Sequence, residues 1–137
     1  MIAQTLTTSF KEQLLLAGHN FATNTFKMAL YTAPANLGAA TTTYSSTNEV
    51  VGTGYTAGGE VLTGVTVTTS GTTAYVDFSN VVWPTANFTT RGALIYNVTA
   101  GGNSVAVLDF GADKTPTTSF TVAMPANTAA SALIRLP

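Results

Sequence analysis

The sequence predicts a mainly β protein: an antiparallel β-sandwich or small barrel with about seven or eight strands and one short N-terminal helix. Beyond about residue 25, apolar residues recur at every second position, which is the spacing of half-buried strands. Glycine, asparagine and proline interrupt these runs at short intervals, as turns between strands require. The 137 residues are enough for one domain. We therefore expect an N-terminal helix or arm over residues 1–24 and a single antiparallel β domain over residues 25–137.

The helix is predicted from the segment Ser9 to Glu12, which has the form of a capping box. In that motif the serine side chain accepts from a free backbone N–H, and the glutamate reaches back to the serine N–H. Phe10 and Leu14 then share one face, and Gly18 is placed to end the helix in a left-handed conformation. Because the helix is short and precedes the strands, residues 1–24 could instead form an arm that docks on a neighbouring molecule.

The first strand is predicted where Phe26, Met28 and Leu30 alternate with other residues, which favours one buried face. Residues 34–48 are mostly alanine, threonine, serine and asparagine, with few large apolar side chains. They cannot bury much surface, so we expect a long loop. Loops of this kind often carry binding contacts.

The middle of the chain is predicted to form a hairpin over residues 61–78 that turns at Ser70-Gly71. Trp83 stands in a short bulky stretch closed by Pro84, which suits a strand end or an edge. We expect the Trp83 side chain to anchor the core.

The last third of the chain is predicted to pair residues 93–96 with residues 105–108 across a turn at 99–103. Both runs are almost continuously apolar, which indicates burial on both faces. Two short strands, over residues 120–124 and 132–136, complete the predicted set.

The composition is rich in threonine and poor in charged residues. The chain has 27 threonines, whereas Lys, Arg, Asp and Glu together number 11, and the formal net charge is −1. Threonine suits a pleated surface, and burying its hydroxyl costs less than burying a charge. Since few lysines protect the strand edges, we favour edges that meet partners over the alternative, a monomer with a polar but uncharged coat.

Several classes of site are unlikely on composition alone. There is no cysteine and only one histidine, which removes disulfides, thiolate chemistry and zinc clusters. The near-neutral charge argues against a nucleic-acid partner. The longest apolar run, residues 14–17, is too short to cross a membrane, and no signal-peptide pattern begins the chain. We expect a soluble, unprocessed protein that is not an enzyme, with no catalytic residue, cofactor, metal, nucleic acid or membrane partner.

Three features resemble parts of catalytic or phosphate-binding sites, but each is expected to have a structural role. His19 follows the helix and is expected at the helix end or on the surface, because no nucleophile signature accompanies it. The glycine run over residues 52–59 is expected to form turns, since no helix follows to cradle a phosphate. Glu49 and Glu60 flank this run and could pair as acid and base, but the segment has the character of an exposed loop.

The remaining polar candidates are similarly weak. Asp109 and Asp113 lie near a glycine and are expected in a turn, because a calcium site needs more carboxylates. Arg91 could be an ion-pair partner in the interior or at an interface, or a solvated residue at a strand end. The triplets beginning at Asn87 and Asn97 match the glycosylation pattern, but without a secretory signal we treat both as chance.

The stretch from Asn48 to Leu62, which includes the glycines and Tyr55, is the most characteristic piece of the sequence. Further such pieces are residues 76–78, Trp83, 91–97, 107–111, 120–122 and 133–135. Together these segments resemble a group of small virion structural proteins of tailed bacteriophages, some of which are similar to capsid decoration (cement) proteins. The likeness covers roughly residues 25 to 137.

The resemblance implies a protein on the capsid exterior of a virion, made in the bacterial host cytoplasm. Its partners would be the major capsid protein and copies of itself, as a dimer or trimer, with contacts through the N-terminal segment and residues 34–48. The resemblance implies no catalytic or binding residues. Two alternatives stay open: a tail, neck or fibre component, and a carbohydrate-binding module or small hydrolase using Trp83, the tyrosines and Glu49 or Glu60.

Overall fold

The structure is a computed structural model that describes all residues, Met1–Pro137. It contains one helix and ten strands. In chain order these are β1 (Thr5–Leu6), α1 (Thr8–Leu15), β2 (Phe26–Tyr31), β3 (Glu60–Val61), β4 (Thr66–Ser70), β5 (Thr73–Asp77), β6 (Val81–Trp83), β7 (Thr90–Asn97), β8 (Asn103–Lys114), β9 (Phe120–Val122) and β10 (Ile134–Leu136). No helix has the length and apolar character needed to cross a membrane.

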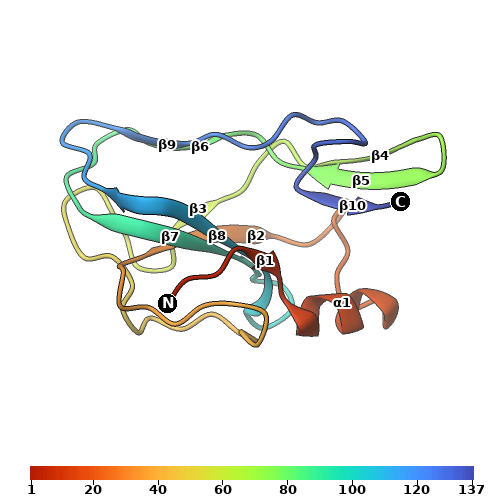
Figure 1. The fold of residues 1–137 in the computed structure, drawn as a ribbon, viewed down its shortest axis with the longest axis horizontal. Coiled ribbons are helices and arrows are strands. Elements are labelled where there is room, and N and C mark those ends of the chain that lie inside the picture. The colour runs from red at the N-terminus through yellow and green to blue at the C-terminus, as the bar shows by residue number, and fades with distance from the viewer.

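The strands form a layered, all-antiparallel structure, which confirms the predicted sandwich-like β fold. A five-stranded sheet has the order β1-β8-β7-β2-β3, a three-stranded sheet the order β10-β5-β4, and β6 pairs with β9. The two small sheets lie above the large one in Figure 1, and α1 lies beside it below the three-stranded sheet. The strand number exceeds the predicted seven or eight because several strands are only two or three residues long.

The centre of the five-stranded sheet is buried on both faces. Along β2, Met28 and Leu30 face the main core, whereas Ala29 and Tyr31 belong to a second cluster on the opposite face. The expectation of one buried face for β2 was therefore wrong, because residues far along the chain cover its other side. The pairing of residues 93–96 with 105–108 and their burial on both faces are confirmed.

The main core fills the space between the large sheet and the two small ones. Trp83 is fully buried in it, as predicted, and packs near the rings of Tyr55 and Phe120. Phe10 joins this core from α1, so the helix is held by its one buried aromatic side chain. Burial of a large aromatic side chain contributes about 2–3 kcal/mol, which a helix of eight residues needs, since such short helices are unstable alone.

The helix ends differ in detail from the prediction. Thr7, not Ser9, caps the helix: its backbone is extended, and its Oγ1 accepts from the Phe10 N–H at 3.3 Å. Ser9 is already helical and turns its hydroxyl towards the Thr41 carbonyl. At the other end the left-handed residue is Ala17, with φ +58, and Gly18 follows it. The predicted cap and stop were thus each displaced by one or two residues.

The N-terminal segment lies on the sheet of its own chain. Thr5 and Leu6 of β1 pair with Val107 and Ala106 of β8, and Thr7 N–H donates to the Val105 carbonyl at 3.0 Å. Residues 1–24, expected as a helix or arm, therefore include an edge strand of the large sheet as well as α1.

The predicted hairpin over residues 61–78 was too long. Glu60 and Val61 pair with β2, whereas the hairpin begins at Thr66 and ends at Asp77 in another sheet. The chain passes from one sheet to the other at Gly64, which has φ +64. A Cβ added at this position would lie 1.9 Å from the Ser79 hydroxyl oxygen, so a side chain does not fit there. An alternating pattern continues across this point, so periodicity alone could not show where one sheet ends.

Candidate interaction surface

The N-terminal segment and the loop over residues 34–48 lie side by side. The Met1 amino group donates to the Ala35 carbonyl at 3.0 Å, and the Leu37 N–H donates to the Met1 carbonyl at 3.0 Å. The Ala3 N–H donates to the Leu37 carbonyl at 2.9 Å, so Ile2 and Leu37 form a parallel bridge. Two segments that the sequence marked separately as contact regions thus form one surface, which we call the arm–loop surface (residues 1–3 and 34–48).

The arm–loop surface rests on the second core cluster. Ile2 and Ala35 are buried there against Tyr31, Leu94 and Val107 of the large sheet. Gly92, on β7, makes room for this contact, because a Cβ at that position would lie 2.9 Å from the Ile2 side chain. The surface is therefore backed by the most buried sheet of the molecule.

Glu49 fastens the loop at its C-terminal end. The Glu49 carboxylate accepts from the Tyr44 hydroxyl at 2.5 Å, from the Gly58 N–H at 2.7 Å, and from the Tyr55 hydroxyl. Tyr44 also stacks on Tyr96, with ring centroids 4.7 Å apart. Burial, with the carboxylate beside them, raises the pKa of Tyr44 and of Tyr55 well above the usual value, so both remain donors. Three donors on one buried carboxylate give a strong, directional fastening.

A second group of polar contacts fastens the middle of the loop. Ser104, fully buried at the start of β8, donates to Thr7 Oγ1 or to the Thr41 carbonyl, at 2.9 and 2.8 Å. The Ser104 N–H donates to the Thr42 carbonyl at 2.9 Å, and the Tyr44 N–H to the Gly102 carbonyl at 2.8 Å. Loop, helix cap and sheet are therefore joined, and the loop is held in one conformation along its length.

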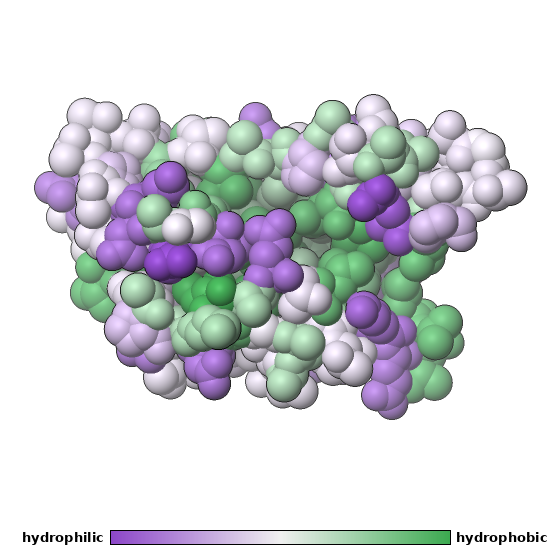
Figure 2. Space-filling view, in the orientation of Figure 1, coloured by the Kyte–Doolittle hydropathy of each residue, from purple (hydrophilic) through white to green (hydrophobic).

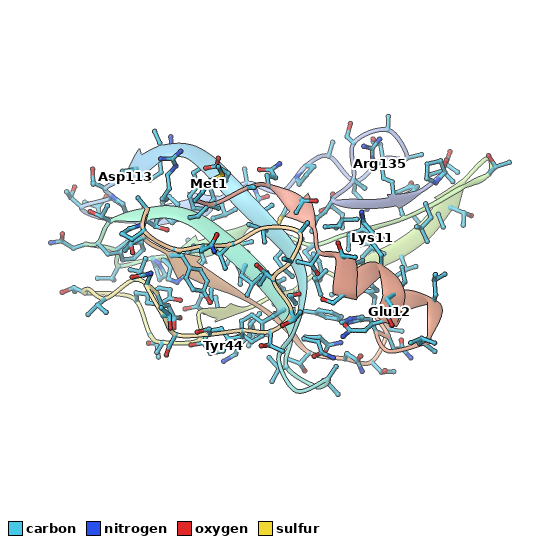
Figure 3. The ribbon with its side chains drawn as sticks, turned by 60° about the horizontal axis from the view of Figure 1, so that its bottom comes forward. Met1, Lys11, Glu12, Tyr44, Asp113 and Arg135 are labelled. Atoms are coloured by element: carbon cyan, nitrogen blue, oxygen red, sulfur yellow. The ribbon has the colours of Figure 1, made fainter.

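The arm–loop surface contains no charged side chain. It surrounds a hollow of about 560 Å³ with Tyr31 at its base, and its rim consists of alanine, threonine, serine, asparagine, proline, leucine and methionine side chains. Figure 3 shows Met1 and Tyr44 on this side of the molecule, with Lys11 and Glu12 on α1 beside them and Asp113 and Arg135 nearer the edges of the view. Apart from the Met1 ammonium, which already donates to the Ala35 carbonyl, this surface can be covered without removing water from a charged group.

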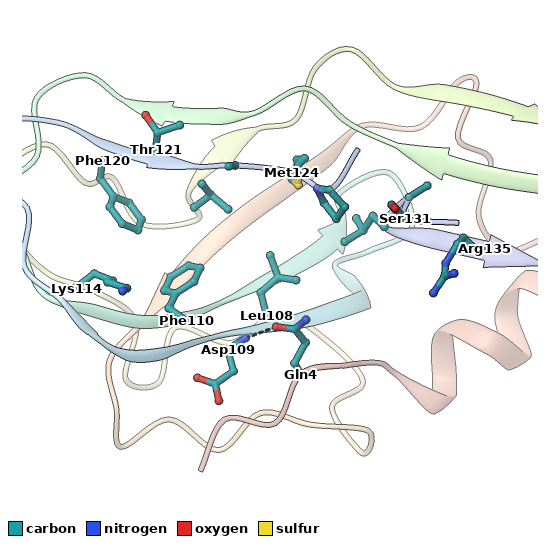
Figure 4. Close-up of a pocket in the computed structure, with 15 residues that line it drawn as sticks. Gln4, Leu108, Asp109, Phe110, Lys114, Phe120, Thr121, Met124, Ser131 and Arg135 are labelled. Atoms are coloured by element: carbon teal, nitrogen blue, oxygen red, sulfur yellow. Dashed lines mark hydrogen bonds between the residues drawn. The ribbon is translucent and has the colours of Figure 1, made fainter. Parts of the chain in front are cut away.

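A second hollow, of about 480 Å³, opens between β8 and β9 (Figure 4). Phe110 and Phe120 face one another across it with ring centroids 5.7 Å apart. The Arg135 guanidinium donates to the Ala130 carbonyl at 2.7 Å. Asp109 is engaged with Arg91, described below. The Arg135 guanidinium and the Asp109 carboxylate are therefore both engaged by groups of their own chain.

His19 lies just beyond the end of α1, one of the two places expected for it, but it is buried, so the alternative of a surface position was wrong. Its Nδ1 accepts from the Asn97 side-chain amide at 3.0 Å, and its Nε2 donates to the Gln13 side-chain oxygen at 2.8 Å. This assignment of the neutral tautomer satisfies both partners. Burial lowers the pKa of His19, and the ring packs beside Phe10 and Phe26. His19 therefore joins the helix to the end of β7, and Asn97, from a glycosylation triplet, is buried with it.

The two glutamates that flank the glycine run do not form an acid–base pair. Glu49 lies opposite Tyr31 and Glu60 opposite Met28 along β2. Only Glu49 turns into the interior, and Glu60 is exposed. Glu49 was expected in an exposed loop, and this was wrong. Tyr44 and Tyr55, only five and six residues away, turn their hydroxyls onto its carboxylate, but the irregular segment between them has no periodicity that would show it.

The glycine run forms turns, as expected. Gly54, Gly58 and Gly59 have φ values of +87, +96 and +81, and the run leads into the short strand β3. At Gly59 a Cβ would stand 1.8 Å from the Met28 carbonyl oxygen. This close approach explains the glycine at that position and gives the run a purely conformational role.

Arg91 and Asp109 form the ion pair of the chain, with Arg91 Nε 3.2 Å from Asp109 Oδ1 and both side chains about one-third exposed. The Gly111 N–H and Arg91 together lower the pKa of Asp109. Asp113 is exposed beyond them, and no group of three or more potential metal-ligating side chains gathers in the structure. Arg91 thus forms an ion pair within its own chain, as one alternative expected, but the pair is partly exposed near the start of β7 and is not in the interior.

Comparison of the chain with protein-family models, with curated proteins and with solved structures finds no match.

Proposed function

We propose that this protein is a capsid decoration (cement) protein of a tailed bacteriophage, and not an enzyme. In this proposal it binds the assembled shell of the major capsid protein through the arm–loop surface, by non-covalent contacts alone. The observation that carries the proposal is that the arm–loop surface has no charged side chain, its one charge being the Met1 ammonium that donates to the Ala35 carbonyl, and that it rests on the buried large sheet. The resemblance of residues 25 to 137 to virion structural proteins supports the same assignment.

The chemistry of the arm–loop surface suits association. Burying charged groups at an interface carries a large desolvation cost, whereas alanine methyls and threonine hydroxyls can be covered cheaply. The loop is already held by Glu49 and Ser104, so binding need not order it. Pre-ordered segments lose less conformational entropy on association, which raises affinity for a given contact area.

The mechanism would be mass action. A protein that binds the assembled shell, but not the dissociated subunits, stabilises the shell in proportion to its occupancy. Many symmetry-related copies multiply a modest single-site affinity. The fold's role is then to present one pre-formed surface without charged side chains, in many copies, against the internal pressure of the genome.

The proposal is tested on shells prepared with and without the protein. Shells carrying the wild-type protein should resist heat and chelator better than bare shells, and equal resistance would overturn the proposal. Ala40→Asp places a charge on the arm–loop surface and should weaken binding to the shell at least tenfold. Ala126→Asp is the matched control, since both alanines are exposed loop residues and only Ala40 lies on that surface.

Quantitative mass spectrometry of purified virions separates this proposal from the tail, neck or fibre alternative. A decoration protein should be present in hundreds of copies, whereas a ring or spike component has far fewer. A low copy number would therefore contradict the proposal even if the protein is found in the particle.

A further inference from the structure

The end of the molecule that carries the three-stranded sheet has an open apolar hollow. About 150 Å³ in volume, it lies between α1 and the inner face of this sheet, and every residue lining it is hydrophobic, among them Leu14, Val67, Ile134 and Leu136. Figure 2 shows hydrophobic atoms on both sides of the notch between the hairpin and the helix. Val67 is 58% exposed here, although it lies on the apolar face of its strand.

The same sheet ends in an unprotected edge. β4 has β5 as its only neighbour, and its five residues are three threonines, a valine and a serine, with no charge, proline or bulge. Natural edge strands usually carry at least one such protection against pairing with another chain. β4 is also the longest strand with a wholly free edge, since the other outermost strands have two or three residues.

The direction of the free backbone groups of β4 follows from its turn. The turn after Ser70 has two residues and begins with Gly71 at φ +59, so the pair Ser70–Thr73 that closes it exchanges hydrogen bonds within the hairpin. Such pairs alternate along an antiparallel ladder. The N–H and C=O groups of Val67 and Thr69 therefore point away from β5, towards the free edge.

We propose that β4 binds β4 of a second copy of this chain, antiparallel, so that two three-stranded sheets join into one six-stranded sheet. An antiparallel edge is self-complementary: a two-fold axis perpendicular to the sheet pairs each outward N–H with an outward C=O of the other copy. That axis keeps both inner faces on one side. The two hollows then become one continuous apolar channel, and Val67 of each copy is covered by the other.

A second copy is favoured over a foreign segment by charge and by composition. β4 presents no charge that could select a partner of opposite sign, and the net charge of −1 makes repulsion between copies weak. The β-branched side chains of both edges pack well across an antiparallel pair. This inference specifies the self-association that the resemblance to virion proteins implies, and it uses the end of the molecule that the arm–loop surface leaves free.

The test is the mass of the purified protein in solution, by light scattering and native mass spectrometry over a dilution series. The wild-type protein should be a dimer at micromolar concentration. Val67→Asp and Thr69→Pro should each raise the dimer dissociation constant at least 100-fold. Proline at position 69 removes only an outward N–H, which the hairpin does not use. Val82→Asp is the matched control, because Val82 is a strand residue, 49% exposed, on β6; its dimer should be unchanged.

Hydrogen exchange gives a second measurement that does not depend on variants. The amides of Val67 and Thr69 should exchange more slowly at high than at low protein concentration, and those of β3 and β9 should not change. A wild-type protein that stays monomeric at millimolar concentration, a trimer, or equal weakening by Val82→Asp would overturn the inference. These measurements use no shells, so a monomer that still binds shells would leave the proposed function intact, and a dimer that ignores shells would overturn that function alone.

Discussion

The two ends of the molecule differ in how completely their sheets are covered. Around β2 and β7 both faces are covered, one by the small sheets and the other by the arm–loop layer, and the central residues are almost fully buried. At β4 and β5 the outer strand remains open and its valine is exposed. The closed end therefore holds the fold and presents the arm–loop surface, whereas the open end leaves the backbone groups of β4 free for the dimer contact that we propose.

The largest expected difference between the ends comes from a matched pair of leucines. Leu94 is fully buried in β7. The substitution Leu94→Ala should lower the free energy of unfolding by about 3–4 kcal/mol, because it leaves a cavity that the surrounding side chains cannot fill. Leu136→Ala, half-exposed on β10, should cost under about 1 kcal/mol in the monomer. Urea unfolding at low protein concentration measures both values, and equal costs would remove the distinction between the ends.

Glu49 should be the most sensitive polar position at the closed end. Glu49→Ala leaves two tyrosine hydroxyls and the Gly58 N–H without their acceptor, so we expect a loss of about 3 kcal/mol. Glu60→Ala, an exposed glutamate nearby in the sequence, should change stability by less than about 0.5 kcal/mol. Thermal unfolding compares the two, and a stable Glu49→Ala protein would show that the loop is not fastened by its carboxylate.

Two glycines with positive φ, one at each end, test how tightly the two ends are packed. Gly59→Ala places a Cβ against the Met28 carbonyl and should destabilise the protein by about 2 kcal/mol. Gly71→Ala, in the hairpin turn at the open end, has nothing within 4 Å of the new Cβ and should cost only the backbone strain, about 1 kcal/mol. Denaturant midpoints of the two variants give the difference, which should vanish if the closed end is loosely packed.

The smallest effect concerns Asp77, which is buried at the end of β5 with one carboxylate oxygen unpartnered. Burial raises the pKa of Asp77, so the folded state prefers the protonated acid. The stability that this protonation provides is fully present below the unfolded pKa and is lost as pH rises through the folded pKa. Asp77→Asn should therefore raise the free energy of unfolding at pH 7 by about 1 kcal/mol. Unfolding curves at several pH values should show this advantage shrinking in acid.

The sequence could predict those parts of the fold that depend on neighbours in the chain. Trp83 was identified as a core residue because it stands in a compact apolar stretch, and residues 93–96 were paired with 105–108 because a glycine turn joins two apolar runs. In both cases the signal lies within about a dozen residues. The β-rich class followed from the same short-range pattern.

The rest depended on partners that are distant in sequence. Tyr31 was not predicted to be buried on its face of β2, because its cover comes from the alanine-rich loop, which has no hydrophobic pattern of its own. His19 was expected at the helix end or on the surface, and its burial against Asn97, 78 residues away, has no local signal. Two contact segments, residues 1–3 and 34–48, were named separately, but no local signal shows that they adjoin. Long-range polar burial of this kind leaves little trace in a single sequence.

The lone ion pair between Arg91 and Asp109 has a consequence for the environments that the protein tolerates. Dissolved electrolyte weakens attraction between exposed charges, and here there is almost none to weaken, since this single contact is partly open to water. Screening by salt should therefore change the free energy of unfolding little between low and high ionic strength. A particle assembled from such units would carry little dependence on the salinity of the medium through which it travels.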